Sequence, residues 1–111
     1  MDNKKDNTYY LNKVVKDLGF IIKHTSGITK DKLEQDEVLQ DSVMFRLIQV
    51  SENAARLTDD FKLRYREVPW QAIKGMRNRL VHEYGNVDLT IIYDTVTKDI
   101  PKLYEALSQL I

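Results

Sequence analysis

The chain has 111 residues, the length of a single domain, and its 17 lysines and arginines balance its 17 acidic residues, so no global field draws it to nucleic acid or anionic lipid. It contains no cysteine, which excludes disulfides, thiolate metal sites and cysteine nucleophiles. Because no apolar run approaches the roughly 18 residues of a membrane span, and the polar start lacks the apolar core of a secretory signal, we expect one domain, residues 1–111, in the cytoplasm.

Apolar residues recur at helical spacing along nearly the whole chain, and this pattern predicts an all-α fold. We expect residues 1–7 to form a disordered tail, followed by a first helix from about Thr8 to Thr25. A short helical turn is expected at Thr29–Leu33. The segment Asp36–Leu57 has an apolar stripe wide enough for burial on more than one side, which predicts that it is the central helix.

A capping residue and a proline mark the next two helices. Thr58, followed by two aspartates, predicts the start of a short basic helix that ends at Val68-Pro69. Pro69 suits the first turn of a further helix, from about Trp70 to Glu83, because its missing N–H is no loss there. We expect Gly85 to stop this helix in the left-handed conformation.

The last helix is expected to begin after Asp88, a capping residue, and its apolar stripe reaches the chain end. Pro101 lies inside that stripe. Because the apolar pattern continues in phase beyond Pro101, we expect the proline to bend the helix rather than to end it. Four main helices with short connections, plus one short helix, predict an antiparallel bundle.

Arg77 lies at an unusual place on the helix expected from Trp70 to Glu83. With Ile73 at zero and about 100° per residue, Arg77 falls near +40°, inside the apolar arc. A guanidinium in that arc needs a carboxylate, a cluster of carbonyls or an anionic ligand, or it must extend to solvent. Glu52, at the edge of the central helix's apolar stripe, is a candidate carboxylate.

His82 falls on the opposite face, about 140° from Arg77, together with Gly75 and Asn78. Asn78 precedes His82 by four residues, so the two side chains can touch, and Gly75 leaves room for a ligand or another backbone. A straight helix cannot point Arg77 and His82 at one small target. Either the last turn unwinds before Gly85, or a second chain completes the site. A third interpretation is structural, because a lone histidine near a helix C-terminus commonly interacts with the helix dipole.

Arg77, His82 and Tyr84 match the R-x4-H-x-Y signature of the HepT-like toxins of the HEPN superfamily, and Arg77-Asn78 with Val81-His82 reproduces its RN…VH form. The chain resembles this family over roughly residues 8–110, and its central helix, short basic helix, motif helix and last helix follow one another in the family's order. One departure is Ser51, where relatives often have glycine. The resemblance implies a HEPN-like bundle of five helices that forms a homodimer with its motif helices at a shared cleft.

The resemblance also implies an activity and a partner. The activity is endoribonuclease cleavage that needs no metal and no cofactor, with Arg77 and His82 as catalytic residues. The partner is a minimal nucleotidyltransferase antitoxin, the second component of a type VII toxin–antitoxin system, which adds AMP to the motif tyrosine, here Tyr84. Asn78 and Glu52 are expected to support the two catalytic residues.

Metal-free cleavage of RNA requires a base for the 2′-hydroxyl, an acid for the leaving 5′-oxygen and positive charge near the phosphorane. One chain offers one His82, so a two-fold dimer would supply the second imidazole, and Arg77 would stabilise the equatorial oxygens. Two alternatives stay open. One is a non-catalytic module that binds RNA or nucleotides in the same cleft, and the other is a structural partner subunit of a nucleotidyltransferase.

Overall fold

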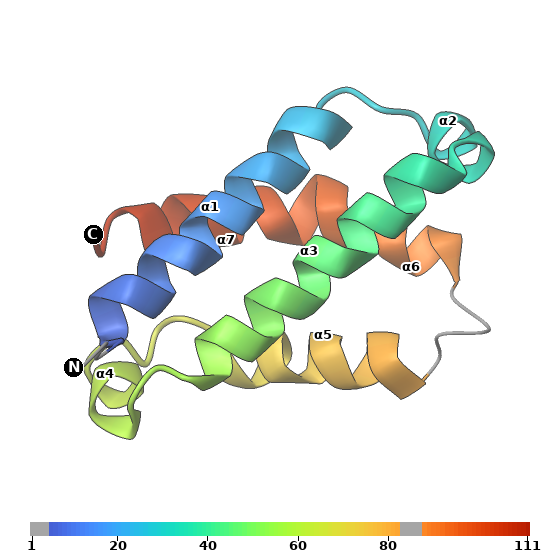
Figure 1. Ribbon diagram of the computed structural model, residues 1–111. Helices are drawn as coiled ribbons and strands as arrows, with labels where there is room; N and C mark the ends of the chain where they lie inside the picture. Colours follow the sequence, from blue (N-terminus) through green and yellow to red (C-terminus); the bar gives the residue numbers. More distant parts are fainter. Residues whose placement is uncertain (1–4, 83–87) are drawn as a thin grey trace.

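The computed structural model describes residues 5–82 and 88–111, and it describes positions 77 and 80–82 by their backbone alone. The described residues form helices and connecting segments, without a strand, which confirms the predicted all-α fold. In chain order the helices are α1 (Asn7–Thr25), α2 (Lys30–Gln35), α3 (Glu37–Ala55), α4 (Asp59–Arg64), α5 (Trp70–His82), α6 (Leu89–Asp94), the π-helical η2 (Thr95–Asp99) and α7 (Ile100–Ser108) (Figure 1).

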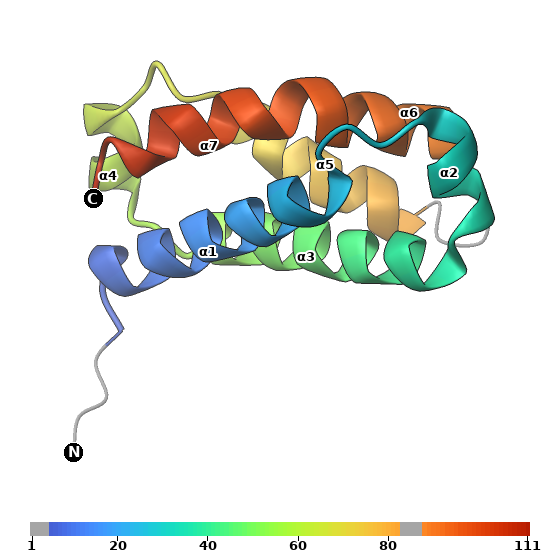
Figure 2. The same ribbon diagram turned by 90° about the horizontal axis from the view of Figure 1, so that it is seen from above.

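The long helices form an antiparallel bundle, as predicted. The central helix α3 packs against α1 on one side and against α5 on the other, and α7 packs against α1. Helices α1 and α3 lie in one layer, and the last helix, composed of α6, η2 and α7, lies in a second layer behind them (Figure 2). Helix α5 runs along one edge of the bundle, beside α3 (Figure 1).

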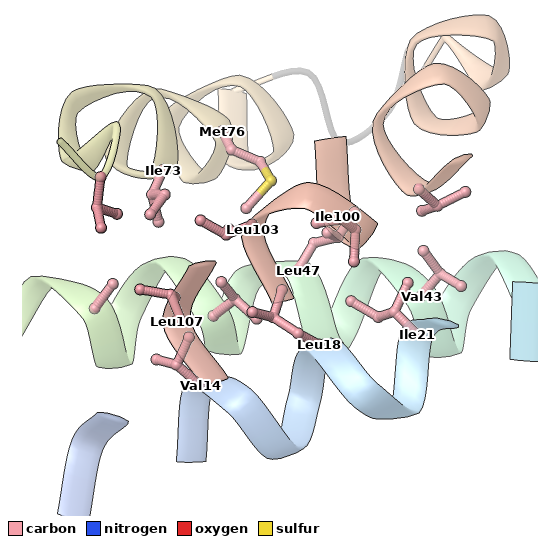
Figure 3. Close-up of a cluster of buried hydrophobic side chains, with 14 of the residues drawn as sticks. Val14, Leu18, Ile21, Val43, Leu47, Ile73, Met76, Ile100, Leu103 and Leu107 are labelled. Carbon is pink, nitrogen blue, oxygen red and sulfur yellow. The ribbon is translucent and has the colours of Figure 1, made fainter. Parts of the chain in front are cut away.

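The core lies between the two layers and is made of aliphatic side chains from all four long helices. Figure 3 labels ten buried members: Val14, Leu18 and Ile21 of α1, Val43 and Leu47 of α3, Ile73 and Met76 of α5, and Ile100, Leu103 and Leu107 of α7. Burying each such side chain contributes about 1.5–3 kcal/mol relative to leaving it in water. Through Ile73 and Met76, the core holds α5 by one face and leaves its opposite face exposed.

Side-chain caps set where most of the helices begin. Thr58 and Asp88 act as predicted, accepting hydrogen bonds from the amides of Phe61 and Thr90 respectively. Asp6, Thr29 and Asp36 cap α1, α2 and α3 in the same way. Each cap satisfies an amide that would otherwise have no intrahelical partner.

The first helix begins earlier than the expected disordered tail of residues 1–7 allows. Asp6 is the N-cap of α1 and Asn7 is its first residue. The side-chain Nδ2 of Asn7 donates to Thr58 Oγ1 at 3.0 Å, and the Thr58 backbone N–H donates to Asn7 Oδ1 at 2.9 Å. The expected tail is therefore wrong at its C-terminal end, because a partner 51 residues away fixes Asn7. Residues 1–4 lie outside the described residues.

The last helix passes Pro101 without ending, as predicted, and it does so through a π-helical turn. The Ile100 N–H bonds to the carbonyl oxygen of Thr95, five residues back, instead of four. Pro101 follows directly, in the first turn of α7. Proline has no N–H to donate, and at this position none is required. The turn places Thr95 and Asp99 on the side of the last helix that faces α5.

Hydrogen bonds from two side chains, Ser51 and Trp70, fix the position of α5. Ser51 Oγ, buried in α3, donates to the carbonyl oxygen of Ile73 at 2.8 Å. At the start of α5, Trp70 Nε1 donates to the carbonyl oxygens of Lys62 at 3.2 Å and Tyr65 at 3.1 Å, which ties α5 to the α4 segment. Pro69 lies just before the helix rather than in its first turn, and its carbonyl accepts from the Ile73 N–H at 3.1 Å.

Candidate functional site

Helix α5 carries the predicted catalytic residues, and its contacts with the rest of the bundle hold it in place. Its buried residues Ile73 and Met76 join the core, and Ser51 holds its middle by a hydrogen bond. The helix is continuous from Trp70 to His82, so Arg77 and His82 are both helical positions, five residues apart. The predicted end of this helix, with Glu83 and Gly85, lies outside the described residues.

The continuous helix bears on the two alternatives for bringing Arg77 and His82 together. In a regular α-helix, positions five residues apart differ in direction by about 140°. The helix does not unwind between Arg77 and His82, so the unwinding alternative does not apply to that interval. Unwinding between residues 83 and 85 lies outside the described residues, and the alternative in which a second chain completes the site stays a prediction.

The supporting residues occupy exposed positions. Asn78 is exposed on α5, and Glu52 is exposed on α3, the helix beside it. The pairing of Glu52 with Arg77 stays a prediction, because the Arg77 side chain is not among those described. Tyr84, the predicted modification site, lies outside the described residues.

The exposed face of α5 is open, as the glycine in it suggested. Among the described residues, a Cβ atom built on Gly75 would meet no atom within 4 Å apart from its chain neighbours and the backbone of its own helix. Gly75 and Asn78 are both exposed and follow one another at a spacing of three residues, so they share this face. A ligand or a second chain can therefore approach the α5 backbone closely beside the motif.

A groove between α5 and the last helix was not predicted from the sequence. We call it the α5–α7 groove. It has a volume of about 570 Å³ and is lined by Ala72, Gly75, Met76 and Arg79 of α5 and by Thr95, Asp99, Lys102, Leu103 and Ala106 of η2 and α7, among others. The Arg-Asn-Arg run of α5 was one available signal, because it places a second arginine, Arg79, beside the motif.

The rim of the α5–α7 groove is charged and its floor is apolar. Arg79, Asp99 and Lys102 are all exposed. Within the described part of the chain, none of these three side chains forms an ion pair or a hydrogen bond. Ile73, Met76 and Leu103 lie beneath them as part of the core. The groove thus offers free charges above an aliphatic surface.

The other histidine belongs to a packing cluster between α1 and α3. The His24 ring lies 4.3 Å from the Phe20 ring, and the Arg46 guanidinium lies 3.9 Å above Phe20. Arg46 also forms an ion pair with buried Asp17 at 2.6 Å. Arg46 of α3 thus contacts both Asp17 and Phe20 of α1. We therefore interpret this cluster as a structural contact between the two helices.

The described side chains of residues 5–82 and 88–111, which do not include that of His82, contain no group of three or more histidine or acidic residues that could hold a metal ion. None of the helices traced in these ranges is long and apolar enough to cross a membrane.

Comparison with known proteins places the motif in a family context. The family described as "Ribonuclease HepT-like" matches residues 15–110. A Caldanaerobacter subterraneus subsp. tengcongensis protein named "Putative RNase" is 31% identical over 102 residues, which are 92% of this chain and 91% of that protein. A Thermococcus cleftensis protein named "Probable ribonuclease HepT" is 30% identical over 100 residues, 90% of this chain and 91% of that protein.

A third relative is longer than this chain. A Methanocaldococcus jannaschii protein named "Gamma-glutamylcyclotransferase and putative RNase" is 33% identical over 107 residues, which are 96% of this chain and 48% of that protein. No solved structure matches the chain with significance. The family match spans all of α3 and α5, so it includes the helix on which Arg77 and His82 lie.

Proposed function

The chain belongs to the HepT-like ribonuclease family of the HEPN superfamily, and on this premise we propose that it is an endoribonuclease toxin that cleaves RNA without a metal ion. The observation that carries the proposal is that Arg77 and His82 lie on one continuous helix, α5, beside an open face. The toxin would act on RNA in the cytoplasm, in a type VII toxin–antitoxin system.

The proposed reaction is attack of a ribose 2′-hydroxyl on the adjacent phosphorus. One His82 imidazole accepts the hydroxyl proton while the bond from the 2′-oxygen to phosphorus forms. A second imidazole donates a proton to the 5′-oxygen as the bond from phosphorus to that oxygen breaks. The products are a 2′,3′-cyclic phosphate and a free 5′-hydroxyl. Arg77 stabilises the negative charge of the equatorial oxygens, the role that fixed positive groups have in such transition states.

The second imidazole comes from a second copy of the chain. The regular course of α5 supports this, because it keeps the positions of Arg77 and His82 about 140° apart on one helix. A two-fold axis beside α5 would bring His82 of one copy near Arg77 of the other. Asn78, exposed one turn before His82, would orient the imidazole or a phosphate, and Glu52 would pair with Arg77.

Regulation would act on Tyr84. A minimal nucleotidyltransferase antitoxin transfers AMP from ATP to the tyrosine hydroxyl and releases pyrophosphate. Tyr84 is two residues from His82 in the chain. An AMP group there adds bulk and negative charge where an RNA phosphate must lie, so the modified protein would lose its activity through both exclusion and repulsion.

The test is RNA cleavage by the purified protein in the presence of EDTA. Wild type is expected to leave cyclic phosphate ends, and His82→Ala is expected to be inert. Equal cleavage by both proteins would contradict the proposal. RNA binding without cleavage by wild type, retained in His82→Ala and lost in Arg77→Ala, would indicate a non-catalytic binding module. A stable complex with a nucleotidyltransferase, without RNA affinity, would indicate a structural subunit.

A further inference from the structure

The α5–α7 groove lies beside the motif helix and has no assigned role in the proposed cleavage. Its floor is formed where Ile73 and Met76 of α5 meet Leu103 of α7, and the three side chains point toward one another (Figure 3). A floor of this kind suits the flat, largely apolar face of a nucleobase, whose removal from water contributes to binding. The volume of about 570 Å³ is within the range of small-ligand sites.

The rim supplies charge of the sign that RNA requires. Arg79 stands on the α5 wall and Lys102 on the opposite wall, and Asp99 is the one acidic residue among the described side chains that line the groove. The three charges sum to one positive. All three are exposed and without an ionic partner among the described residues. They can therefore contact a ligand without first breaking an internal ion pair.

The groove leads toward the proposed catalytic position. Gly75, Arg79 and His82 occupy positions i, i+4 and i+7 of the continuous helix α5, so these three positions share one face. Gly75 and Arg79 line the groove. At 1.5 Å per residue, position 82 is about 4.5 Å farther along the helix axis than position 79. A strand that lies in the groove thus continues toward His82 within the length of one nucleotide.

We propose that the α5–α7 groove binds a nucleotide of the RNA strand next to the cleaved phosphate. The base lies on Ile73, Met76 and Leu103, and its flanking phosphates contact Arg79 and Lys102. Asp99 accepts a hydrogen bond from an N–H group of the base. This inference rests on the proposed function, since it assigns the groove to the same RNA that α5 would cleave.

A second copy of the chain is the other occupant to consider, and the charges disfavour it. In a two-fold contact the same patch of both copies faces itself, so the net positive rim would face a net positive rim. Interface centres also contain few charged residues. RNA has one negative charge per nucleotide, so its contact with Arg79 and Lys102 is attractive and releases counterions.

The test measures binding of a fluorescent 2′-O-methyl RNA oligonucleotide, which cannot be cleaved because its 2′-hydroxyl is blocked. Lys102→Glu is expected to weaken binding about tenfold, whereas the matched control Lys98→Glu, on η2 but outside the groove, is expected to change it by less than about twofold. Equal losses in the two variants, or no loss in Lys102→Glu, would overturn the inference.

A second pair of variants fills the groove without changing charge. Ala106 lines the groove and is exposed, so Ala106→Trp is expected to block RNA binding while the helical content stays unchanged. Gln109→Trp, also exposed on the C-terminal segment but outside the groove, is expected to bind as wild type. If Ala106→Trp instead lowers the molecular mass measured by sedimentation, the groove is an interface between copies and the inference is wrong.

The binding assay separates this inference from the proposed function. If wild type cleaves RNA but Lys102→Glu and Lys98→Glu bind the blocked oligonucleotide equally, the groove assignment fails and the ribonuclease stands. If wild type does not cleave RNA but the groove variants alone lose binding, the ribonuclease proposal fails and the groove remains an RNA site.

Discussion

Ser51 of α3 donates a hydrogen bond from its hydroxyl to the carbonyl oxygen of Ile73 in α5, with an oxygen–oxygen distance of 2.8 Å. The Ser51 side chain is buried, and Ile73 belongs to the turn of α5 that precedes Arg77. The bond therefore joins the central helix to the helix that carries the motif.

Replacing Ser51 by alanine should weaken the attachment of α5. Ser51→Ala removes one buried hydrogen bond, so we expect the free energy of unfolding to fall by about 0.5–1.5 kcal/mol. The measurement is the midpoint of urea unfolding. Ser42→Ala serves as the control, because the Ser42 hydroxyl in the same helix forms no hydrogen bond with any described residue. Equal midpoints for Ser51→Ala and wild type would show that the bond adds no stability.

Removing Arg46 should destabilise the bundle without touching the motif helix. Arg46→Ala leaves the carboxylate of Asp17, whose side chain is 9% exposed, without its ion-pair partner. We expect a loss of about 2–4 kcal/mol, the lower end reflecting the 28% exposure of the Arg46 side chain. Thermal unfolding and RNA cleavage by the folded fraction measure the two effects separately.

The exposed ion pair of Lys98 and Asp94, at 3.7 Å, provides the control for that experiment. Lys98→Ala is expected to change the stability by less than about 1 kcal/mol, because water screens an exposed pair. A large loss of cleavage per folded molecule in Arg46→Ala would mean that the cluster around Asp17 has a role in the reaction.

Tyr84→Phe should separate cleavage from its regulation. Phenylalanine keeps the ring but removes the hydroxyl that would receive AMP, so we expect this variant to cleave RNA and to resist inactivation by a nucleotidyltransferase with ATP. Intact-mass measurement should find one added AMP on wild type and none on the variant. AMP found on Tyr84→Phe would assign the modification to another residue.

Local chemistry made much of the fold predictable. Thr58 and Asp88 cap helices by accepting hydrogen bonds from backbone amides two or three residues away. Such a cap can therefore be predicted from a few neighbouring residues of the sequence. The disruption at Pro101 was predictable because proline lacks an N–H, but its form was not. The π-helical turn joins Thr95 to Ile100, both of which are buried in the bundle, and no local pattern of the sequence records that packing.

Contacts between distant segments were not predictable. Asn7 was assigned to a disordered tail. The local sequence gives no sign of its hydrogen bond to Thr58, which is 51 residues away. The α5–α7 groove combines Arg79 with Asp99 and Lys102, which come from two helices that the sequence pattern does not place side by side. The predicted separation of Arg77 and His82 needed only the helical period, and the continuous course of α5 between them agrees with it.

The proposed site uses His82 from both copies of the chain, and a mixed dimer tests this arrangement. A wild-type copy and a His82→Ala copy, with different affinity tags, are co-expressed, and two-step purification isolates the mixed dimer. The measured quantity is the rate at which it forms 2′,3′-cyclic phosphate ends on RNA with EDTA present. We predict a rate as low as that of the His82→Ala homodimer, because one imidazole cannot accept the 2′-hydroxyl proton and donate a proton to the 5′-oxygen in the same step. A rate near half that of the wild-type dimer would contradict the two-chain site.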